Sequence, residues 1–250
     1  MFESVIPNQF RVFRAMGLGF SSWFRNFIPF TSLAVILYAP VFAWVALSDP
    51  RKATSVDDLV SSYFVRPLYV MAGVGVLVPA LITYRVVQQL GGQQVSMGES
   101  IVRGVRGIAP GLIVAVIVNL LQLIPVGGII AAVLTCTWFV ATPAAVAEKL
   151  GPFAAMGRSG VLTLGRRWGI FGLTFLVGLV VALTAMVWIV PAINRGDASF
   201  LTSFKTWTVV FMALMGVLHL YTGVVASVSY ALLRQDKDGM SHEALAAVFD

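Results

Sequence analysis

Residues 207–233 read WTVVFMALMGVLHLYTGVVASVSYALL, an apolar stretch without Asp, Glu, Lys or Arg. A helix needs about 20 such residues to cross the hydrocarbon core of a bilayer. Backbone N–H and C=O groups in that core have to be hydrogen-bonded within the segment, so the stretch is expected to be helical. The sequence therefore predicts a transmembrane helix here.

Five further apolar runs precede this one, at residues 27–47, 67–87, 108–124, 127–147 and 168–193. Charged residues make up only 11% of the chain, hydrophobic residues 58%, and the mean hydropathy is +0.89. An average soluble domain is about 25% charged. We therefore expect residues 1–250 to form a single all-α membrane domain, with six transmembrane helices arranged as three hairpins.

The distribution of Lys and Arg predicts the orientation, because cytoplasmic connections carry an excess of both. With the N-terminus inside, one side of the membrane has twelve of them and the other has five. The twelve are Arg11, Arg14, Arg25, Arg85, Arg103, Arg106, Lys149, Arg158, Arg166, Arg167, Arg234 and Lys237, and the five are Arg51, Lys52, Arg66, Arg195 and Lys205. Both termini are thus expected in the cytoplasm.

Three amphipathic segments precede the first, third and fifth spans, at residues 10–25, 97–108 and 152–167. At 100° per residue, the first segment has its bulky apolar side chains on one side: Val12, Phe13, Met16, Phe20, Trp23 and Phe24. The second opens with a predicted capping box of Ser96 and Glu99. We expect all three to be helices in the membrane interface, and together we call them the collar.

The charged side chains of the collar are the first group of candidate site residues. Arginine suits lipid phosphates, and the inner leaflet is anionic. The predicted contacts to lipid or to a partner are Arg11, Arg14, Arg103, Arg106, Glu148, Arg158, Arg166 and Arg167. The alternative for the densest cluster, from Glu148 to Arg167, is a topology signal with an interfacial salt bridge.

A second candidate site centres on His219, near the middle of the sixth span. An ionisable group at that depth is a functional candidate, with Asn119 and Gln122 of the third span as polar neighbours. The alternative is a neutral imidazole that hydrogen-bonds across helices, to Asn119, Gln122 or a backbone carbonyl. Glycines such as Gly73, Gly75, Gly172 and Gly178 would permit close helix approach.

Catalytic machinery is not expected. No Asp or Glu falls inside a predicted span, the chain has two histidines, and Cys136 is its single cysteine. Acid–base catalysis and metal sites need more such groups, so we expect a protein that is not an enzyme and has no cofactor or metal. The pI near 9.8 follows from the inside-positive bias and does not require nucleic acid.

Two stretches resemble a known bacterial family. They are Pro143, Glu148, Gly151-Pro152-Phe153-Ala154-Ala155, Arg158-Ser159, Leu162-Thr163, Gly165 and Trp168, and then Tyr230, Leu233-Arg234, Lys237, Gly239 and Val248-Phe249. They are similar to the membrane-domain family named after glycerophosphoryl diester phosphodiesterases, which includes the YciC-like inner-membrane proteins. In some relatives this part precedes a catalytic domain, which is not expected within residues 1–250. The resemblance implies a six-span module of the bacterial inner membrane, without catalytic residues.

Two functional hypotheses follow. The first is a non-catalytic module that organises lipids, expected to be anionic, or a partner protein or second copy, through the arginine-rich cytoplasmic collar. The second is a transporter or channel for a small or amphiphilic molecule with a midplane site near His219.

Overall fold

The computed structural model describes residues 12–49, 52–121, 127–194 and 198–239. It is 88% helical, and none of the described residues lies in a strand. Six segments are long and apolar enough to cross a membrane: Phe27–Leu47, Asp57–Leu90, Met97–Val118, Gly128–Glu148, Arg167–Thr184 and Phe204–Asp238. The all-α fold expected from the sequence is confirmed, and the chain is a multi-pass membrane protein.

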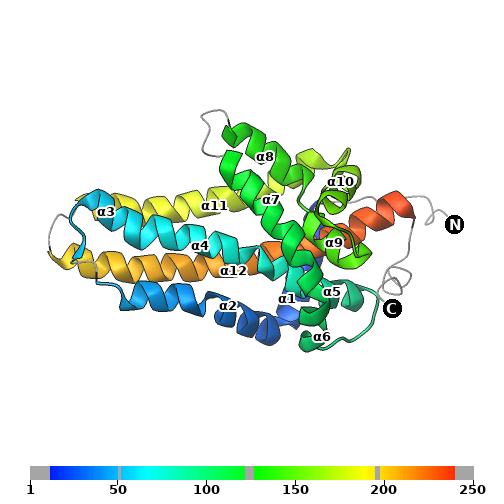
Figure 1. The fold of residues 1–250 in the computed structure, drawn as a ribbon, viewed down its shortest axis with the longest axis horizontal. Coiled ribbons are helices and arrows are strands. Elements are labelled where there is room, and N and C mark those ends of the chain that lie inside the picture. Colours follow the sequence, from blue (N-terminus) through cyan, green and yellow to red (C-terminus); the bar gives the residue numbers. More distant parts are fainter. Residues whose placement is uncertain (1–11, 50–51, 122–126, 195–197, 240–250) are drawn as a thin grey trace.

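Four helices run side by side along the long axis (Figure 1): α2 (Phe27–Leu47), α4 (Arg66–Gly75), α11 (Arg167–Asn194) and α12 (Ala198–Asp238). The short α3 (Val56–Val60) and a π-helical turn (Ser61–Val65) lead into α4. Helix α12 contacts the other three long helices and has 41 residues. At 1.5 Å per residue it is about 60 Å long, about twice the hydrocarbon thickness, so part of it extends beyond the membrane core.

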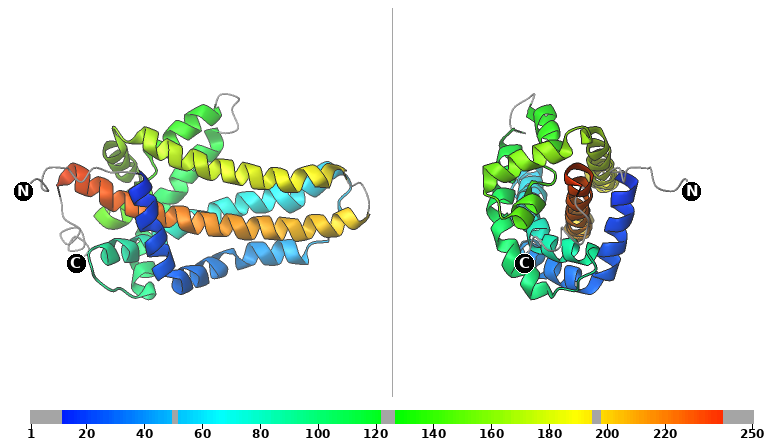
Figure 2. Two further views of the ribbon diagram at one scale, coloured as in Figure 1. Left: turned by 180° about the vertical axis from the view of Figure 1, so that it is seen from behind. Right: turned by 90° about the vertical axis from the view of Figure 1, so that its right-hand side faces the viewer.

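The remaining short helices gather around the last turns of α12, at what we call the collar end (Figure 1). They are α1 (Val12–Arg25), α5 (Leu77–Leu90), α6 (Met97–Gly104) with a 3-10 turn (Val105–Gly107), α9 (Ala141–Glu148) and α10 (Pro152–Thr163). Helix α1 lies across α12 rather than along it (Figure 2). The three predicted collar segments therefore lie at one end of the bundle.

The central hairpin, α7 (Ile108–Leu121) and α8 (Gly127–Thr137), is tilted against the long helices (Figure 1). With 14 and 11 residues, its helices are about 21 and 17 Å long, less than the hydrocarbon core of about 30 Å. The third and fourth candidate spans reach full length only by including α6 and α9, respectively.

Two helical segments extend past the predicted spans. The second span, predicted at 67–87, is part of a helical segment from Asp57 to Leu90 that is interrupted at Val76. The sixth, predicted at 207–233, belongs to a helix from Ala198 to Asp238. Each predicted span lies inside its helix, and a helix of this length continues past the hydrocarbon core. The 3-10 turn and residue Thr163 end the second and third collar helices earlier than predicted, and the predicted end at 124 lies outside the described residues.

Small residues allow close helix contacts at the collar end. A Cβ at Gly19 of α1 would lie 2.8 Å from Cγ2 of Val225 in α12. A Cβ at Gly104 of α6 would collide with the backbone carbonyl oxygen of Ala80 in α5. From Gly223 to Arg234, every residue of α12 is buried. This part of α12 is therefore the centre around which the collar helices pack.

We predict that Gly→Ala substitutions at two positions of α6 differ in their effect on stability. Gly104→Ala should lower the free energy of unfolding by about 1–3 kcal/mol, because its Cβ meets the backbone of α5. Gly98→Ala, exposed and with nothing within 4 Å of the added Cβ, should cause no loss. Thermal unfolding followed by a thiol-reactive dye on the buried Cys136 measures both. Equal melting temperatures for the two variants would contradict the close contact.

Candidate functional site

Six charged side chains at the collar end form ion pairs, which together we call the ion-pair network. Four of them are linked around Glu148 at the end of α9, and Arg166 and Asp236 form a separate pair. The Oε1 atom of Glu148 lies 2.9 Å from Nε of Arg158 in α10 and 3.7 Å from Nε of Arg234 in α12. The hydroxyl of Tyr230 donates to the same oxygen at 3.0 Å and accepts from Arg234 at 2.9 Å. One carboxylate thus joins three helices.

Two carboxylates near the end of α12 complete the network. Asp238 binds Nη2 of Arg158 and lies 3.4 Å from Nε of Arg234, while Asp236 accepts from Arg166 at 3.1 Å. Burial by itself would lower the pKa of the Arg158 guanidinium, but its hydrogen bonds to Asp238 and Glu148 outweigh this and raise the pKa. Three arginines face three carboxylates, so the network has no net charge.

The local sequence explains how Glu148 comes to face Arg158. Lys149 has φ 56°, the left-handed conformation that ends a helix, and Leu150 N–H donates to the Ala145 carbonyl at 3.2 Å. Pro152 then opens α10 at its first turn, where a missing N–H costs nothing. The chain reverses within a few residues, and α10 packs against α9.

The other predicted collar arginines lie in different environments. Arg14 and Arg106 are exposed, and Arg103 lies 3.2 Å from Glu99 and 4.5 Å from the centre of the Tyr84 ring. Nη2 of Arg167 donates to the Gly160 carbonyl over 3.4 Å. Arg11 lies outside the described residues. The predicted group is therefore divided: Arg158 and Arg166 are bound inside the network, whereas others reach the surface.

Some bulky apolar side chains of the collar point away from the bundle. On α1, Phe13, Phe20 and Phe24 are exposed, while Ala15 and Gly19 are buried. In and just after α10, Phe153, Val161 and Leu164 are exposed. Other apolar side chains of the collar helices pack against the core: Val12, Leu18 and Trp23 of α1, Met97 and Ile101 of α6, and Leu162 of α10. Each of these helices thus covers part of its apolar surface and leaves part of it exposed.

Two serines from the collar insert into the backbone of the preceding span. Ser100 of α6 donates to the Leu81 carbonyl at 2.6 Å and accepts from the Arg85 N–H at 3.2 Å. Ser159 of α10 does the same between the Thr137 carbonyl, at 2.8 Å, and the Val140 N–H, at 3.3 Å. Both serines are fully buried. We call them the bridging serines. Their role was not predicted from the sequence.

A polar cluster at the start of α2 was also missed. The buried Asn26 carboxamide accepts from Nε of Arg85 at 2.7 Å and exchanges hydrogen bonds with the Gln89 amide at 2.5 and 2.8 Å. Arg85 also donates to the Val95 carbonyl at 2.7 Å. In the sequence, the position of Asn26 between a collar segment and a span could have indicated this polar cluster.

The capping box at α6 is half confirmed. Ser96 accepts from the Glu99 N–H at 3.1 Å as predicted. The Glu99 carboxylate instead accepts from the Tyr84 hydroxyl at 3.0 Å and pairs with Arg103. Glu99 therefore ties α6 to α5 rather than closing the cap.

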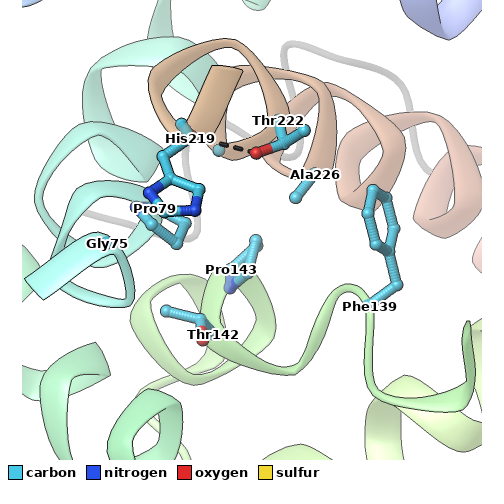
Figure 3. Close-up of a pocket in the computed structure, with 9 residues that line it drawn as sticks. Gly75, Pro79, Phe139, Thr142, Pro143, His219, Thr222 and Ala226 are labelled. Atoms are coloured by element: carbon cyan, nitrogen blue, oxygen red, sulfur yellow. Dashed lines mark hydrogen bonds between the residues drawn. The ribbon is translucent and has the colours of Figure 1, made fainter. Parts of the chain in front are cut away.

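His219 lines a cavity of about 180 Å³ (Figure 3). The other lining residues come from the α4–α5 break, the α8–α9 connection and α12: Gly75, Pro79, Phe139, Thr142, Pro143, Thr222, Gly223 and Ala226. The Nδ1 atom of His219 lies 3.1 Å from the hydroxyl of Tyr38 in α2. This partner differs from the predicted Asn119, Gln122 or backbone carbonyl.

The two other predicted members of this site are not placed by the structure. Asn119 belongs to α7, but its side chain is not described, and Gln122 lies outside the described residues. Of the four glycines singled out, a Cβ would meet a neighbour only at Gly75, where it would lie 2.8 Å from Nδ1 of His219. The cavity is therefore lined by residues at helix breaks, and the contact between these breaks and His219 was not predicted from the sequence.

Within the described residues, no group of three or more His, Cys, Asp or Glu side chains could hold a metal ion. Comparison of the chain with protein-family models, with curated proteins and with solved structures finds no match. The ion-pair network, the collar surface and the His219 cavity are therefore the features from which a function can be inferred.

Loss of the central carboxylate should destabilise the collar end. Glu148→Gln leaves two largely buried guanidinium groups facing a neutral amide, and we expect a loss of about 2 kcal/mol in the free energy of unfolding. The matched control is Glu99→Gln, whose ion pair with Arg103 is 36% and 43% exposed and should contribute less than about 1 kcal/mol. Thermal unfolding in detergent compares the two, and equal losses would contradict a central role for Glu148.

Proposed function

We propose that this chain is a non-catalytic module of the bacterial inner membrane that organises anionic lipids through its collar. Both termini lie in the cytoplasm in this proposal, as the excess of Lys and Arg on that side requires. The resemblance to the membrane-domain family of glycerophosphoryl diester phosphodiesterases supports the choice of membrane. A partner protein, or a second copy of the chain, is the alternative occupant of the same surface.

One observation carries the proposal: exposed aromatic rings lie beside exposed arginines on a helix that crosses the bundle. On α1 these are Phe13, Phe20 and Phe24, with Arg14 and Arg25. Such a helix binds in the interface plane, with its apolar side chains at the acyl boundary and its cations among the headgroups. The anionic inner leaflet attracts each arginine near its surface by about 1 kcal/mol.

The geometry divides the collar arginines into two roles. Arg158 and Arg166 are held by carboxylates of the same chain, so they fix the position of α10 and the start of α11. Contact with lipid phosphates falls to arginines at the surface, such as Arg25 and Arg106. In the sequence-based prediction, Arg106, Arg158 and Arg166 alike contact lipid or a partner, and the alternative for the cluster from Glu148 to Arg167 is a topology signal with an interfacial salt bridge.

A transporter or channel is the second candidate function, and one observation favours it. Two interrupted helical segments meet at the His219 cavity, as broken helices do at the substrate sites of many transporters. The cavity of about 180 Å³ is, however, smaller than the roughly 300–1,000 Å³ of most ligand pockets. The lipid-organising module therefore remains our first proposal.

The double variant Arg25→Gln/Arg106→Gln tests the proposal. We expect its affinity for phosphatidylglycerol to fall about tenfold or more, since two surface cations are lost. Extraction into polymer nanodiscs, followed by quantification of phosphatidylglycerol and phosphatidylethanolamine around the protein, provides the measurement.

Lys52→Gln/Arg66→Gln is the matched control, because it removes two charges from exposed residues outside the collar. It should leave the lipid ratio unchanged. Equal ratios for both double variants would rule out lipid binding by the collar. Loss of a copurifying protein with an unchanged lipid ratio would assign the surface to a partner.

A further inference from the structure

The His219 cavity lies where two prolines interrupt helices. Pro79 follows Gly75 by four residues and Pro143 follows Phe139 by four, and all four residues line the cavity. A proline has no N–H, so neither Pro79 nor Pro143 can donate to the carbonyl group one turn before it. The carbonyls of Gly75 and Phe139 thus lack their regular helical donors beside the same space.

The hydrogen-bonding state of His219 follows from its partner. The Tyr38 hydroxyl is 3.1 Å from Nδ1, and no acceptor other than this nitrogen is seen for it among the described residues. We assign the phenol as the donor to Nδ1, so that the proton of a neutral imidazole is on Nε2. Figure 3 shows the ring extending from α12 toward Gly75 and Pro79, at the cavity. Nε2–H is the donor available to a molecule inside.

The rest of the lining is mainly apolar. Phe139, Pro79, Pro143 and Ala226 supply carbon atoms, and Gly75 leaves room for the His219 ring, which a Cβ would meet at 2.8 Å. The Thr222 hydroxyl donates to the His219 carbonyl at 3.0 Å. The Thr142 Oγ1 lies next to α7, 3.1 Å from where a Cβ on Gly111 would be. An occupant therefore needs one hydroxyl-sized polar group and a hydrocarbon part.

The position along α12 indicates how an occupant would enter. Helix α1 crosses α12 near Val225, and the Tyr221 hydroxyl donates to the Met16 carbonyl at 3.2 Å. His219 is six residues before Val225, about 9 Å along the axis. With α1 in the interface, the cavity lies just below the headgroups, where amphiphilic molecules concentrate.

We infer that this cavity is a binding site for an uncharged amphiphile that carries a hydroxyl group on hydrocarbon. The hydroxyl oxygen accepts from Nε2–H of His219, its proton goes to a carbonyl that proline has left without a donor, and the hydrocarbon lies against Phe139 and Ala226. A space of about 180 Å³ holds one ring or a short chain. The source is either a free small alcohol or the head of a neutral diacylglycerol. This site goes beyond the collar proposal and does not depend on lipid contacts by arginine.

Imidazole NMR of the ¹⁵N-histidine-labelled chain in nanodiscs tests the site. The chain has only two histidines, so His242 serves as the internal reference. Titration with benzyl alcohol should shift the Nε2 resonance of His219 and leave His242 unchanged. Toluene, which has the ring without the hydroxyl, should bind about tenfold more weakly, because it leaves Nε2–H without an acceptor. A second titration with 1,2-dioctanoylglycerol separates the two sources: a response to it alone assigns the lipid, and a response to benzyl alcohol alone assigns the small molecule.

Ala226→Leu, which fills the cavity, should weaken binding at least tenfold, while Ala109→Leu on the exposed side of α7 should not. Binding of toluene as tightly as benzyl alcohol to the native chain would overturn the role of the hydroxyl, even if Ala226→Leu failed to fold. Unchanged binding in a folded Ala226→Leu, or no response to either alcohol, would overturn the site. The phosphatidylglycerol ratio should be the same in Ala226→Leu as in the native chain, so a failure here is distinguishable from a failure of the collar proposal.

Discussion

The burial of α12 from Gly223 to Arg234 is the constraint on which the collar end depends. A helix that is covered all round needs neighbours at close range, and small residues make this feasible. Gly223 lies against Pro79, where a Cβ would be 3.3 Å from the proline nitrogen, and the Ser227 hydroxyl meets that of Thr83 at 2.9 Å. Helices α1, α5, α9 and α10 all contact this stretch. Their arrangement, and so the shape of the collar, follows from the surface of one helix.

Short helices packed around α12 leave backbone groups without helical partners at their ends. Ser159 binds such groups at the end of α8, where its hydroxyl donates to the Thr137 carbonyl and accepts from the Val140 N–H. Ser100 instead binds the Leu81 carbonyl and the Arg85 N–H inside the continuous helix α5. Asn26 has a comparable role at the junction of α1 and α2. Polar contacts of this kind give each collar helix a fixed position relative to its span.

The sequence predicted the helical class and the approximate location of all six spans, because apolar runs of membrane length have few other solutions. It did not predict how the helices would break. Pro79 and Pro143 are four residues after Gly75 and Phe139, but only the structure shows that all four lie at one cavity. Helix ends were also missed, as at Asp238, because the apolar pattern stops where α12 leaves the membrane core although the helix continues within protein.

For the candidate sites as well, contacts between residues close in sequence were predicted, whereas contacts between distant residues were not. The density of charge from Glu148 to Arg167 marked an important junction, and the interfacial salt bridge considered there exists. Its other carboxylates, Asp236 and Asp238, lie 70 and 80 residues after Arg166 and Arg158, and no local spacing connects them to these two arginines. The partner predicted for His219 was Asn119, Gln122 or a backbone carbonyl, whereas the structure places the Tyr38 hydroxyl of α2 beside it. The first and last spans pack together, which neighbour-to-neighbour hairpin reasoning does not reveal.

The neutrality of the ion-pair network has a consequence for how the collar could recognise lipid. A guanidinium that already binds a carboxylate in a partly desolvated setting must give up that bond before it can bind a phosphate, and the abandoned carboxylate would then repel the same phosphate. Arg158 and Arg166 thus add little to the attraction for an anionic leaflet, however close they lie to it. The attraction depends on the arginines outside the network, and its strength falls with salt as expected for exposed charges. Charge count alone would overestimate it, because three of the twelve cations on the predicted cytoplasmic side, Arg158, Arg166 and Arg234, are paired with carboxylates.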